Sequence, residues 1–224
     1  MPNKELSNYR LLKKRTQAQG VGLFGVADIK AIKAEIDLPI KIVESLPRAV
    51  SLGLPLNQAI LETIETAPNK IYYHHYRLVN QILDQIAFNL AGLIQARGFK
   101  ALPIPASQIV DWQKQSAHLS HKKIAILSGL GWLGRNNLLV NPKLGCQFRL
   151  VTILTDMPLR VDKPIKGSCG KCRLCISSCP VAAIKEEPGD FDYQACFGKL
   201  KEFQKTKVVG QYICGICVKA CLSR

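Results

Sequence analysis

The sequence predicts a mixed α/β (α+β) domain over residues 1–160, followed by a small cysteine-rich domain over residues 161–224. Two observations predict this division. Hydrophobic patterns typical of helices and of buried strands follow one another through the first part, whereas eight of the nine cysteines fall between Cys169 and Cys221. Hydrophobic residues make up 47% of the 224-residue chain, which is ample for a buried core.

The beginning of the chain predicts one helix and two strands. Residues 4–19 place apolar side chains among basic and polar ones at helical spacing, and Gly20 ends this helix. Residues 21–27 form a short apolar run with glycines inside it, which indicates a buried strand that a neighbour approaches closely. Residues 48–54 form a second run that suits a strand.

The longest predicted helix covers residues 71–97, where apolar residues recur at helical spacing up to a glycine. His74 and His75 are adjacent in it, and adjacent helical side chains point about 100° apart. A shared metal ion is therefore disfavoured, and a structural role is favoured. Residues 99–104 predict a further strand, and Pro103 within it indicates a position near an open edge of the sheet.

The cysteines near the C-terminus repeat one spacing. The first group has the form C-x2-C-x2-C-x3-C-P and consists of Cys169, Cys172, Cys175 and Cys179. The second group ends in C-x2-C-x3-C and consists of Cys196, Cys214, Cys217 and Cys221. Three thiolates on a tight loop can surround one face of a cubane cluster, and the fourth ligand then comes from elsewhere. The spacing predicts a two-cluster bacterial ferredoxin-like domain with two [4Fe-4S] clusters.

In such modules the cysteine before the proline ligates the other cluster. The first predicted ligand set is therefore Cys169, Cys172, Cys175 and Cys221. The second predicted set is Cys179, Cys196, Cys214 and Cys217. A zinc site would use only four of these cysteines, haem attachment would need a histidine directly after C-x-x-C, and a disulfide framework would need an oxidising compartment, so all three are disfavoured.

The formal net charge of +15 indicates which kinds of partner the protein can attract. Two oxidised clusters with their thiolates would lower it to roughly +11, which is still strongly basic. A basic surface suits an acidic electron donor, such as a reduced ferredoxin or a flavodoxin-like protein, and nucleic acid is the alternative. The sequence has no recognisable signal peptide and no apolar stretch of membrane-spanning length, so we expect a cytoplasmic protein and no membrane partner.

The second informative stretch is rich in glycine. Gly129, Gly131 and Gly134 satisfy the pattern G-x-G-x-x-G. A dinucleotide site also needs a helix after the glycines. Here a proline follows closely, and we expect a hairpin of residues 138–140 with residues 148–154 instead, so nicotinamide binding is disfavoured.

The same glycines would let the main chain approach a large flat cofactor. Trp132 would cover that cofactor, and Arg135 and Asn136 would donate hydrogen bonds to it. The alternative is a tight turn between a helix and a strand. His121, just before this element, is a candidate catalytic proton donor or cofactor contact, and a capping role is equally compatible with the sequence. Cys146 lies outside the cysteine pattern and is most simply a free thiol.

The segment GLGWLGRNNLLV at residues 129–140, together with the sequence TDMPL at residues 155–159 and the double cysteine motif, resembles the epoxyqueuosine reductases and the corrinoid-dependent reductive dehalogenases. The resemblance implies a nitroreductase-like α/β domain that holds cobalamin next to two clusters. It also implies that electrons pass from the outer cluster to the inner one and reduce cobalt to the nucleophilic cob(I) state.

The chain departs from these enzymes where they carry an acid that protonates the opening epoxide. Residues 103–108 read PIPASQ, without a carboxylate, and Asp111 is the nearest acid. The helical-repeat extension that many members use to grip tRNA does not follow Cys221. We therefore expect a corrinoid- and iron-sulfur-dependent reductase from a short branch of unknown substrate. The alternatives are an electron-transfer protein without its own corrinoid, acting on a partner corrinoid protein, and a tRNA epoxyqueuosine reductase.

Overall fold

The computed structural model of the protein describes residues 2–111 and 116–221. The described residues gather into two compact units. The first unit takes its residues from Met1–Leu54, Asn80–Leu130 and Arg149–Ile165. The second unit takes its residues from Pro55–Val79, Gly131–Phe148 and Lys166–Arg224. The sequence predicts two domains that meet near residue 160. This domain boundary stays a prediction.

A four-stranded sheet forms the centre of the first unit. Its strand order is β1-β2-β6-β3, and the strands are β1 (Leu23–Asp28), β2 (Arg48–Pro55), β3 (Ala101–Ile104) and β6 (Phe148–Thr155). β1 runs antiparallel to β2, and β3 runs antiparallel to β6. The inner residues of β1, β2 and β6 are buried in unbroken runs, which is typical of strands covered on both faces.

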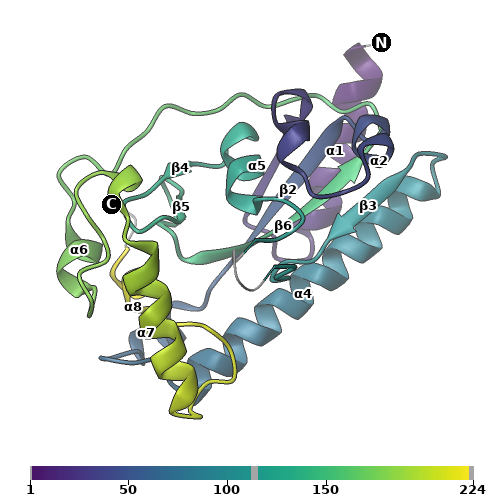
Figure 1. Cartoon of the computed structure of the whole chain (residues 1–224). Coiled ribbons are helices and arrows are strands. Elements are labelled where there is room, and N and C mark those ends of the chain that lie inside the picture. The colour runs from purple at the N-terminus through teal and green to yellow at the C-terminus, as the bar shows by residue number, and fades with distance from the viewer. Residues whose placement is uncertain (1, 112–115, 222–224) are drawn as a thin grey trace. The chain divides into compact units, whose positions relative to one another are not determined.

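Helices supply that cover (Figure 1). They are α1 (Pro2–Gln17), the 3₁₀ helix η1 (Lys30–Glu35), α2 (Ile40–Ser45), α5 (His121–Leu127) and the part of α4 (Lys70–Gln95) that follows residue 79. α1 buries Tyr9 and Leu12 completely or nearly so, and the Tyr9 ring meets the edge of Phe24 in β1. α4 ends beside β3, which follows it directly in the chain. No described helix is long and apolar enough to cross a membrane.

The predicted helices and strands of this unit are confirmed, with shifts of a few residues at their ends. β3 forms one edge of the sheet, as Pro103 predicts, because proline has no N–H to give to a second neighbour. The helix α1 ends before Gly20, which adopts φ +83°. The mixed α/β class is therefore confirmed.

The second unit is built from short elements. These are α3 (Gln58–Glu62), β4 (Trp132–Leu133), β5 (Leu139–Val140), α6 (Leu174–Ser178), η2 (Pro188–Asp190), α7 (Tyr193–Lys205) and α8 (Ile216–Ala220), together with the first residues of α4. α6 and α8 pack against each other, and α3 also contacts α8. A ferredoxin-like fold for the cysteine-rich segment stays a prediction.

The predicted hairpin between residues 138–140 and 148–154 is wrong. β5 pairs with β4 instead, so that Trp132 lies opposite Val140, while β6 belongs to the four-stranded sheet. The reason is local: Gly134 donates its N–H to the Leu138 carbonyl at 2.8 Å, which closes a tight turn directly after the glycines. Asn137 takes the left-handed conformation in that turn, with φ +57°.

Candidate functional site

All eight predicted cluster cysteines lie in the second unit, on two similar segments. In the first, Cys169 and Cys172 precede the helix α6, Cys175 lies in it and Cys179 directly follows it. In the second, Cys214 precedes the helix α8, Cys217 lies in it and Cys221 directly follows it. Gly170 and Gly215 adopt φ +52° and +83°, a conformation that glycine reaches without a steric penalty. These turns wrap the chain around the thiols, as expected for a cluster-binding loop. Cys196 comes from α7.

The thiols divide into two electrostatic neighbourhoods. Burial is the main cause that raises the pKa of Cys175 to about 11, and the neighbouring thiols of Cys221, Cys169 and Cys172 raise it further, in that order. Burial also raises the pKa of Cys214 to about 11, and Cys196 and Cys179 raise it further. The first group has the members of one predicted ligand set, and the second has three of the four members of the other.

Burial likewise raises the pKa of Cys217, and Cys214, Cys196, Cys175 and Cys179 add to the shift. Cys175, a member of the other predicted set, thus affects the pKa of Cys217, so the two groups of thiols lie next to each other. In the described part of the chain, no three His, Cys, Asp or Glu side chains are close enough to hold a single metal ion. A cluster of several irons and sulfides spreads its thiolates more widely than one ion does. The assignment of these thiols to two cluster ligand sets stays a prediction.

Arg135 fixes the first cysteine loop. Its guanidinium donates to three backbone carbonyls, those of Glu186 at 2.5 Å, Cys172 at 2.9 Å and Gly170 at 3.0 Å. Its side chain is only 13% exposed. We expected the Arg135 side chain to donate hydrogen bonds to a flat cofactor, but its guanidinium donates to this loop instead. The geometry therefore supports a structural role for Arg135.

A cavity of about 300 Å³ opens beside this arginine. It is lined by Leu133, Arg135, residues 167–170 and residues 186–188, and it therefore borders Cys169. Trp132 lies on the same segment as Leu133, and its ring packs against Gly167, where a β-carbon would be 2.7 Å from Cζ3. The indole N–H of Trp132 is buried, and among the described residues it has no hydrogen-bond partner.

The three glycines of the motif are approached by the protein's own chain. A β-carbon on Gly129, which has φ +71°, would lie 2.5 Å from the Lys163 carbonyl oxygen. A β-carbon on Gly131 would collide with the Val140 carbonyl, and one on Gly134 would lie 2.5 Å from the Val140 side chain. A helix, α5, precedes the motif and a strand follows it, which is the reverse of the order that a dinucleotide site needs. The cofactor-binding role of these residues stays a prediction.

Asn136 is buried, and its amide nitrogen donates to the Cys146 sulfur at 3.2 Å. Gly145, directly before Cys146, lies against Cys221, since a β-carbon there would be 3.3 Å from the Cys221 sulfur. The sequence predicted only a free thiol at Cys146, because the residue belongs to neither repeated spacing. No sequence signal indicated that it lies beside a candidate cluster ligand.

The segment of Cys146 also holds α8. The Gln147 side chain donates to the carbonyls of Val218 and Lys219 at 3.3 and 3.1 Å. From the other side, the Lys219 ammonium donates to the carbonyls of Glu62, at 3.2 Å, and Ile64, at 2.5 Å. The position of Cys221, which directly follows α8, is therefore set by residues far from it in the sequence.

His121 lies in the first unit, at the start of α5. Its Nε2 donates to the Pro105 carbonyl at 2.9 Å, and its Nδ1 is 2.8 Å from the Thr152 hydroxyl. The side chain keeps a little accessible surface, but protein surrounds the ring on most sides, and this desolvation lowers its pKa to about 4. The neutral ring carries one proton, on Nε2, and donates it to the Pro105 carbonyl. The catalytic role of His121 stays a prediction.

The other histidines have internal partners. The His118 Nδ1 is 2.9 Å from the Asp37 carbonyl, and the His75 Nε2 accepts the Asn57 N–H at 3.0 Å. Desolvation and, secondarily, His74 lower the pKa of His75. His75 thus holds the residue that caps α3, which agrees with the structural role that its sequence position favours.

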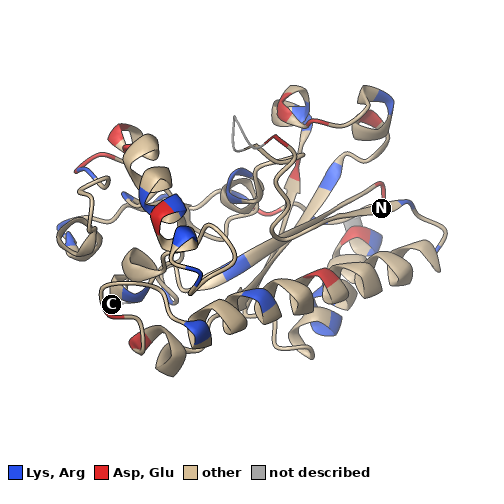
Figure 2. Cartoon of the chain, turned by 60° about the horizontal axis from the view of Figure 1, so that its bottom comes forward, with Lys and Arg blue, Asp and Glu red and all other residues tan. Residues whose placement is uncertain are grey.

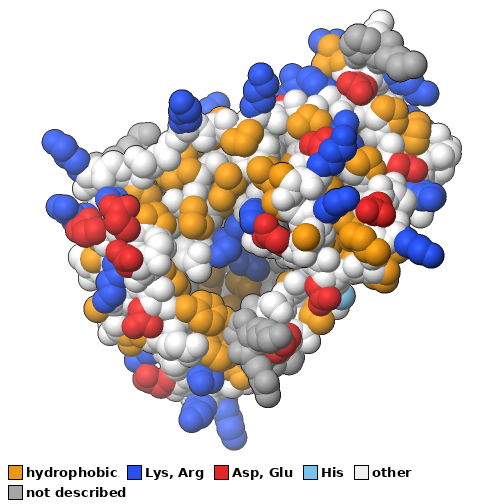
Figure 3. Space-filling view, turned by 45° about the horizontal axis from the view of Figure 1, so that its top comes forward, with side chains coloured by type: hydrophobic (Ala, Val, Ile, Leu, Met, Phe, Trp, Pro, Cys, Tyr) orange, Lys and Arg blue, Asp and Glu red, His pale blue; other side chains and the backbone are white. Residues whose placement is uncertain are grey.

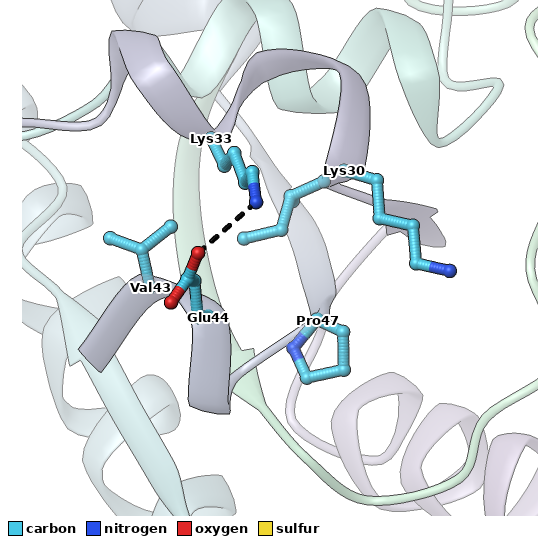
Figure 4. Close-up of a pocket in the computed structure, with 6 residues that line it drawn as sticks. Lys30, Lys33, Val43, Glu44 and Pro47 are labelled. Atoms are coloured by element: carbon cyan, nitrogen blue, oxygen red, sulfur yellow. Dashed lines mark hydrogen bonds and ion pairs between the residues drawn. The ribbon is translucent and has the colours of Figure 1, made fainter. Parts of the chain in front are cut away.

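A second cavity, of about 250 Å³, lies in the first unit between η1 and α2 (Figure 4). Lys33 and Glu44 form an ion pair of 3.2 Å across it, and Lys30 lines its rim. None of the residues that the sequence singled out lines this cavity.

Charge is spread over both units. Lys and Arg number 31 against 16 Asp and Glu, and Figure 2 shows basic residues on many elements, interrupted by acidic ones. The face in Figure 3 carries exposed hydrophobic side chains between these charges. A dispersed positive surface of this kind suits weak, electrostatically guided encounters with an acidic partner.

Known proteins similar in sequence are epoxyqueuosine reductases. That of Aliivibrio fischeri is 36% identical over 133 residues, which are 59% of this chain and 34% of that protein. That of Pseudomonas aeruginosa is 32% identical over 173 residues, which are 72% of this chain and 44% of that protein. The chain thus spans less than half the length of these curated relatives. No protein-family model matches the chain.

Solved structures agree in fold. The epoxyqueuosine reductase of Streptococcus thermophilus superposes with a TM-score of 0.63 at 18% identity, over 96% of this chain and 65% of that chain. A reductive dehalogenase, whose structure suggests a mechanism for B12-dependent dehalogenation, reaches 0.66 at 20% identity, over 81% of this chain and 26% of that chain. The chain therefore belongs to the superfamily of the epoxyqueuosine reductases and the reductive dehalogenases, as its glycine-rich and cysteine motifs predict.

Proposed function

We propose that the protein is a cytoplasmic iron-sulfur oxidoreductase that uses two [4Fe-4S] clusters and a bound corrinoid for a low-potential reduction. The feature that supports the proposal is the repeated cysteine spacing, whose eight cysteines all lie in the second unit. Adjoining clusters suit electron transfer in two steps, and their low potentials suit corrinoid chemistry. The donor we propose is an acidic protein such as a reduced ferredoxin or a flavodoxin.

The chain's own residues would contribute position and shielding. Cys175 is 9% exposed, so its sulfur is screened from water, and a dry environment lowers the reduction potential of a cluster. Arg135 would hold the first loop in the shape that three ligands require. A bound corrinoid would supply a cobalt centre able to accept low-potential electrons.

Cobalamin titration of the anaerobically purified protein tests the corrinoid part. We expect a change in the cobalamin absorption spectrum and a higher melting temperature, because a ligand that binds only the folded state stabilises it. A spectrum and a melting temperature that stay the same at saturating cobalamin would refute this part. A protein with both clusters that instead forms a stoichiometric complex with a partner corrinoid protein would be an electron-transfer protein without its own corrinoid.

Reduction of epoxyqueuosine in tRNA is the second candidate. It is supported by the sequence relatives and by a structural neighbour, with TM-score 0.63 and 18% identity, in which an epoxyqueuosine reductase is bound to a tRNA stem loop. That match covers 95% of this chain and 64% of the other. The strand β3 and the residues after it offer no carboxylate before Asp111, whose backbone pairs with Ser116. Restoration of queuosine in a strain without its epoxide reductase would establish this activity, and failure with soluble, cluster-loaded protein would exclude it.

A further inference from the structure

The helix α7 and the loop before α8 carry three aromatic rings that contact one another near the surface. Tyr193 stacks on Phe197 with 6.1 Å between the ring centroids, and Phe197 packs edge to face with Tyr212 at 5.3 Å. Tyr193 is 42% exposed, and the other two rings are half-buried. Cys196 and Cys214, two members of the second predicted ligand set, lie on the same two segments. An exposed aromatic group therefore accompanies these ligands.

Exposed lysines continue this surface along α7. The Lys201 ammonium lies 4.8 Å from the centroid of the Phe197 ring, and Lys205 follows one turn later. Neither lysine forms an ion pair with a described residue, whereas the acidic Glu202 is paired with Lys199 at 2.8 Å. Residues four positions apart lie in one row along a helix. Such a row is formed by Tyr193, Phe197, Lys201 and Lys205.

Gly198 leaves the helix backbone bare beside this row. It follows Phe197 and lies one turn before Lys201, in the interior of α7, where glycine is among the least favourable residues. A β-carbon on Gly198 would meet no atom within 4 Å, so no contact within the protein requires glycine here. The missing side chain allows a second backbone to approach the helix closely.

We propose that this α7 surface, formed by Tyr193, Phe197, Gly198, Lys201 and Lys205, is the docking site of an acidic electron-donor protein. The inference rests on the proposed function, because it assigns the place where the donor delivers its electrons. In the docked complex one electron passes from the reduced donor to the cluster of the second ligand set. The donor is oxidised and the cluster is reduced by that electron, and no covalent bond changes. Electron-transfer complexes bury less than about 1,200 Å² in total, so one helix face can serve.

The contacts of the rings favour a protein over a nucleic acid. Lysines and aromatic rings also bind single-stranded nucleic acid, but the bases then stack on free ring faces. Here the Phe197 ring is already packed against two tyrosine rings and the Lys201 ammonium. The acid at the start of the helix, Asp192, is engaged as its N-cap and accepts the Ala195 N–H at 2.9 Å. The exposed lysines therefore leave a positive surface that suits an acidic protein.

The test uses the anaerobically purified holoprotein and two acidic probes, a bacterial flavodoxin and a bacterial two-cluster ferredoxin. Stopped-flow absorbance follows electron transfer from each reduced probe. The double variant Lys201→Gln/Lys205→Gln should lower the association rate about tenfold at low ionic strength, and the rate should depend less on salt. The control Lys30→Gln/Lys41→Gln removes two exposed lysines of the first unit and should change the rate by less than about twofold.

Gly198→Gln tests the close approach. Glutamine favours a helix more than glycine does, so the melting temperature should stay the same or rise. Its side chain would hold the two proteins apart, so the dissociation constant for the same probe should rise about tenfold. A lower melting temperature together with weaker binding would overturn the role of Gly198, because the helix itself would then be damaged.

Several results would overturn the docking site. Equal association rates in the α7 double variant and its control would do so, as would unchanged binding in Gly198→Gln. A wild type that holds both clusters and takes electrons from neither probe would have the same consequence. Binding of a single-stranded oligoribonucleotide that these variants abolish would show that the surface binds nucleic acid instead.

Iron analysis and cobalamin titration of the same preparations separate this inference from the function it rests on. A wild-type protein without two clusters would refute both. Two clusters together with variants that bind the probes like the wild type would refute only the docking site. The expected losses in a protein that binds no cobalamin would refute only the corrinoid part of the function.

Discussion

Replacing Arg135 by methionine should loosen the first cysteine loop and leave the second cluster in place. Methionine keeps an apolar stem but loses the three hydrogen bonds to the carbonyls of Glu186, Cys172 and Gly170. A hydrogen bond from a charged group contributes about 1.5 to 3 kcal/mol when buried and less at the surface. Only the bond to Cys172 is partly buried, so we expect a total loss of about 4 kcal/mol.

A matched control is Arg173→Met. Arg173 also pairs with Glu186, at 2.6 Å, but its side chain is 68% exposed. An exposed ion pair contributes at most about 1 kcal/mol, so this variant should behave like the wild type.

The assay is anaerobic iron release to a chelator. If opening of the loop limits release, 4 kcal/mol corresponds to about a thousandfold faster release. This should affect about four of the eight irons expected from two clusters in Arg135→Met, with the rest leaving at the wild-type rate. Equal rates in the Arg135 and Arg173 variants would refute the idea that Arg135 holds the loop.

Three further predictions concern the ligands, the buried histidine and the glycines. Cys175→Ser should lower iron and acid-labile sulfide from about eight to about four per chain, and a loss of all eight would contradict separate ligand sets. His121 has a pKa of about 4 in the folded protein, below its usual 6.5, so the stability that it contributes above pH 6.5 is lost as the pH falls towards 4, by up to about 3 kcal/mol. His121→Gln should remove this part of the pH dependence of the free energy of unfolding in urea. An unchanged pH profile would count against this reasoning. Gly131→Ala should destabilise the protein by several kcal/mol because its β-carbon collides with the Val140 carbonyl. Gly92→Ala in α4, whose β-carbon meets no atom within 4 Å, should stabilise it by about 1 kcal/mol in the same unfolding measurements. Similar free energies of unfolding for the two variants would show that the backbone around Gly131 can accommodate a side chain.

Much of the first unit was predictable because its elements follow from local periodicity. The apolar runs at β1 and β2 and the stripe of α4 each bury the residues that their spacing selects. The partner of β5 was not predictable in this way. Residues 138–140 are apolar and could pair on either side, and the choice was made by the turn from Gly134 to Leu138.

In the candidate site, too, the features set by local sequence were predictable and those set by long-range contacts were not. Cysteine spacing predicts a chemistry because the loop geometry that a cluster needs is short-range, and all eight of these cysteines lie in the second unit. Arg135 and Gln147 bind backbone carbonyls about 35 to 70 positions later in the chain, and no local pattern encodes such contacts. Their roles became visible only from the tertiary structure.

The anchoring of α8 by Gln147 and by the carbonyls of Glu62 and Ile64 bears on how such proteins can be recombined. A free-standing ferredoxin carries every determinant of its clusters within one continuous stretch, and it can be fused to many enzymes. Here Cys221, the last predicted ligand, is positioned by two segments that precede the cysteine motif by about 20 to 110 residues. A swap of the cysteine-rich stretch between relatives would have to transfer those segments too, because without them the end of α8, and Cys221 directly after it, would lose its anchors.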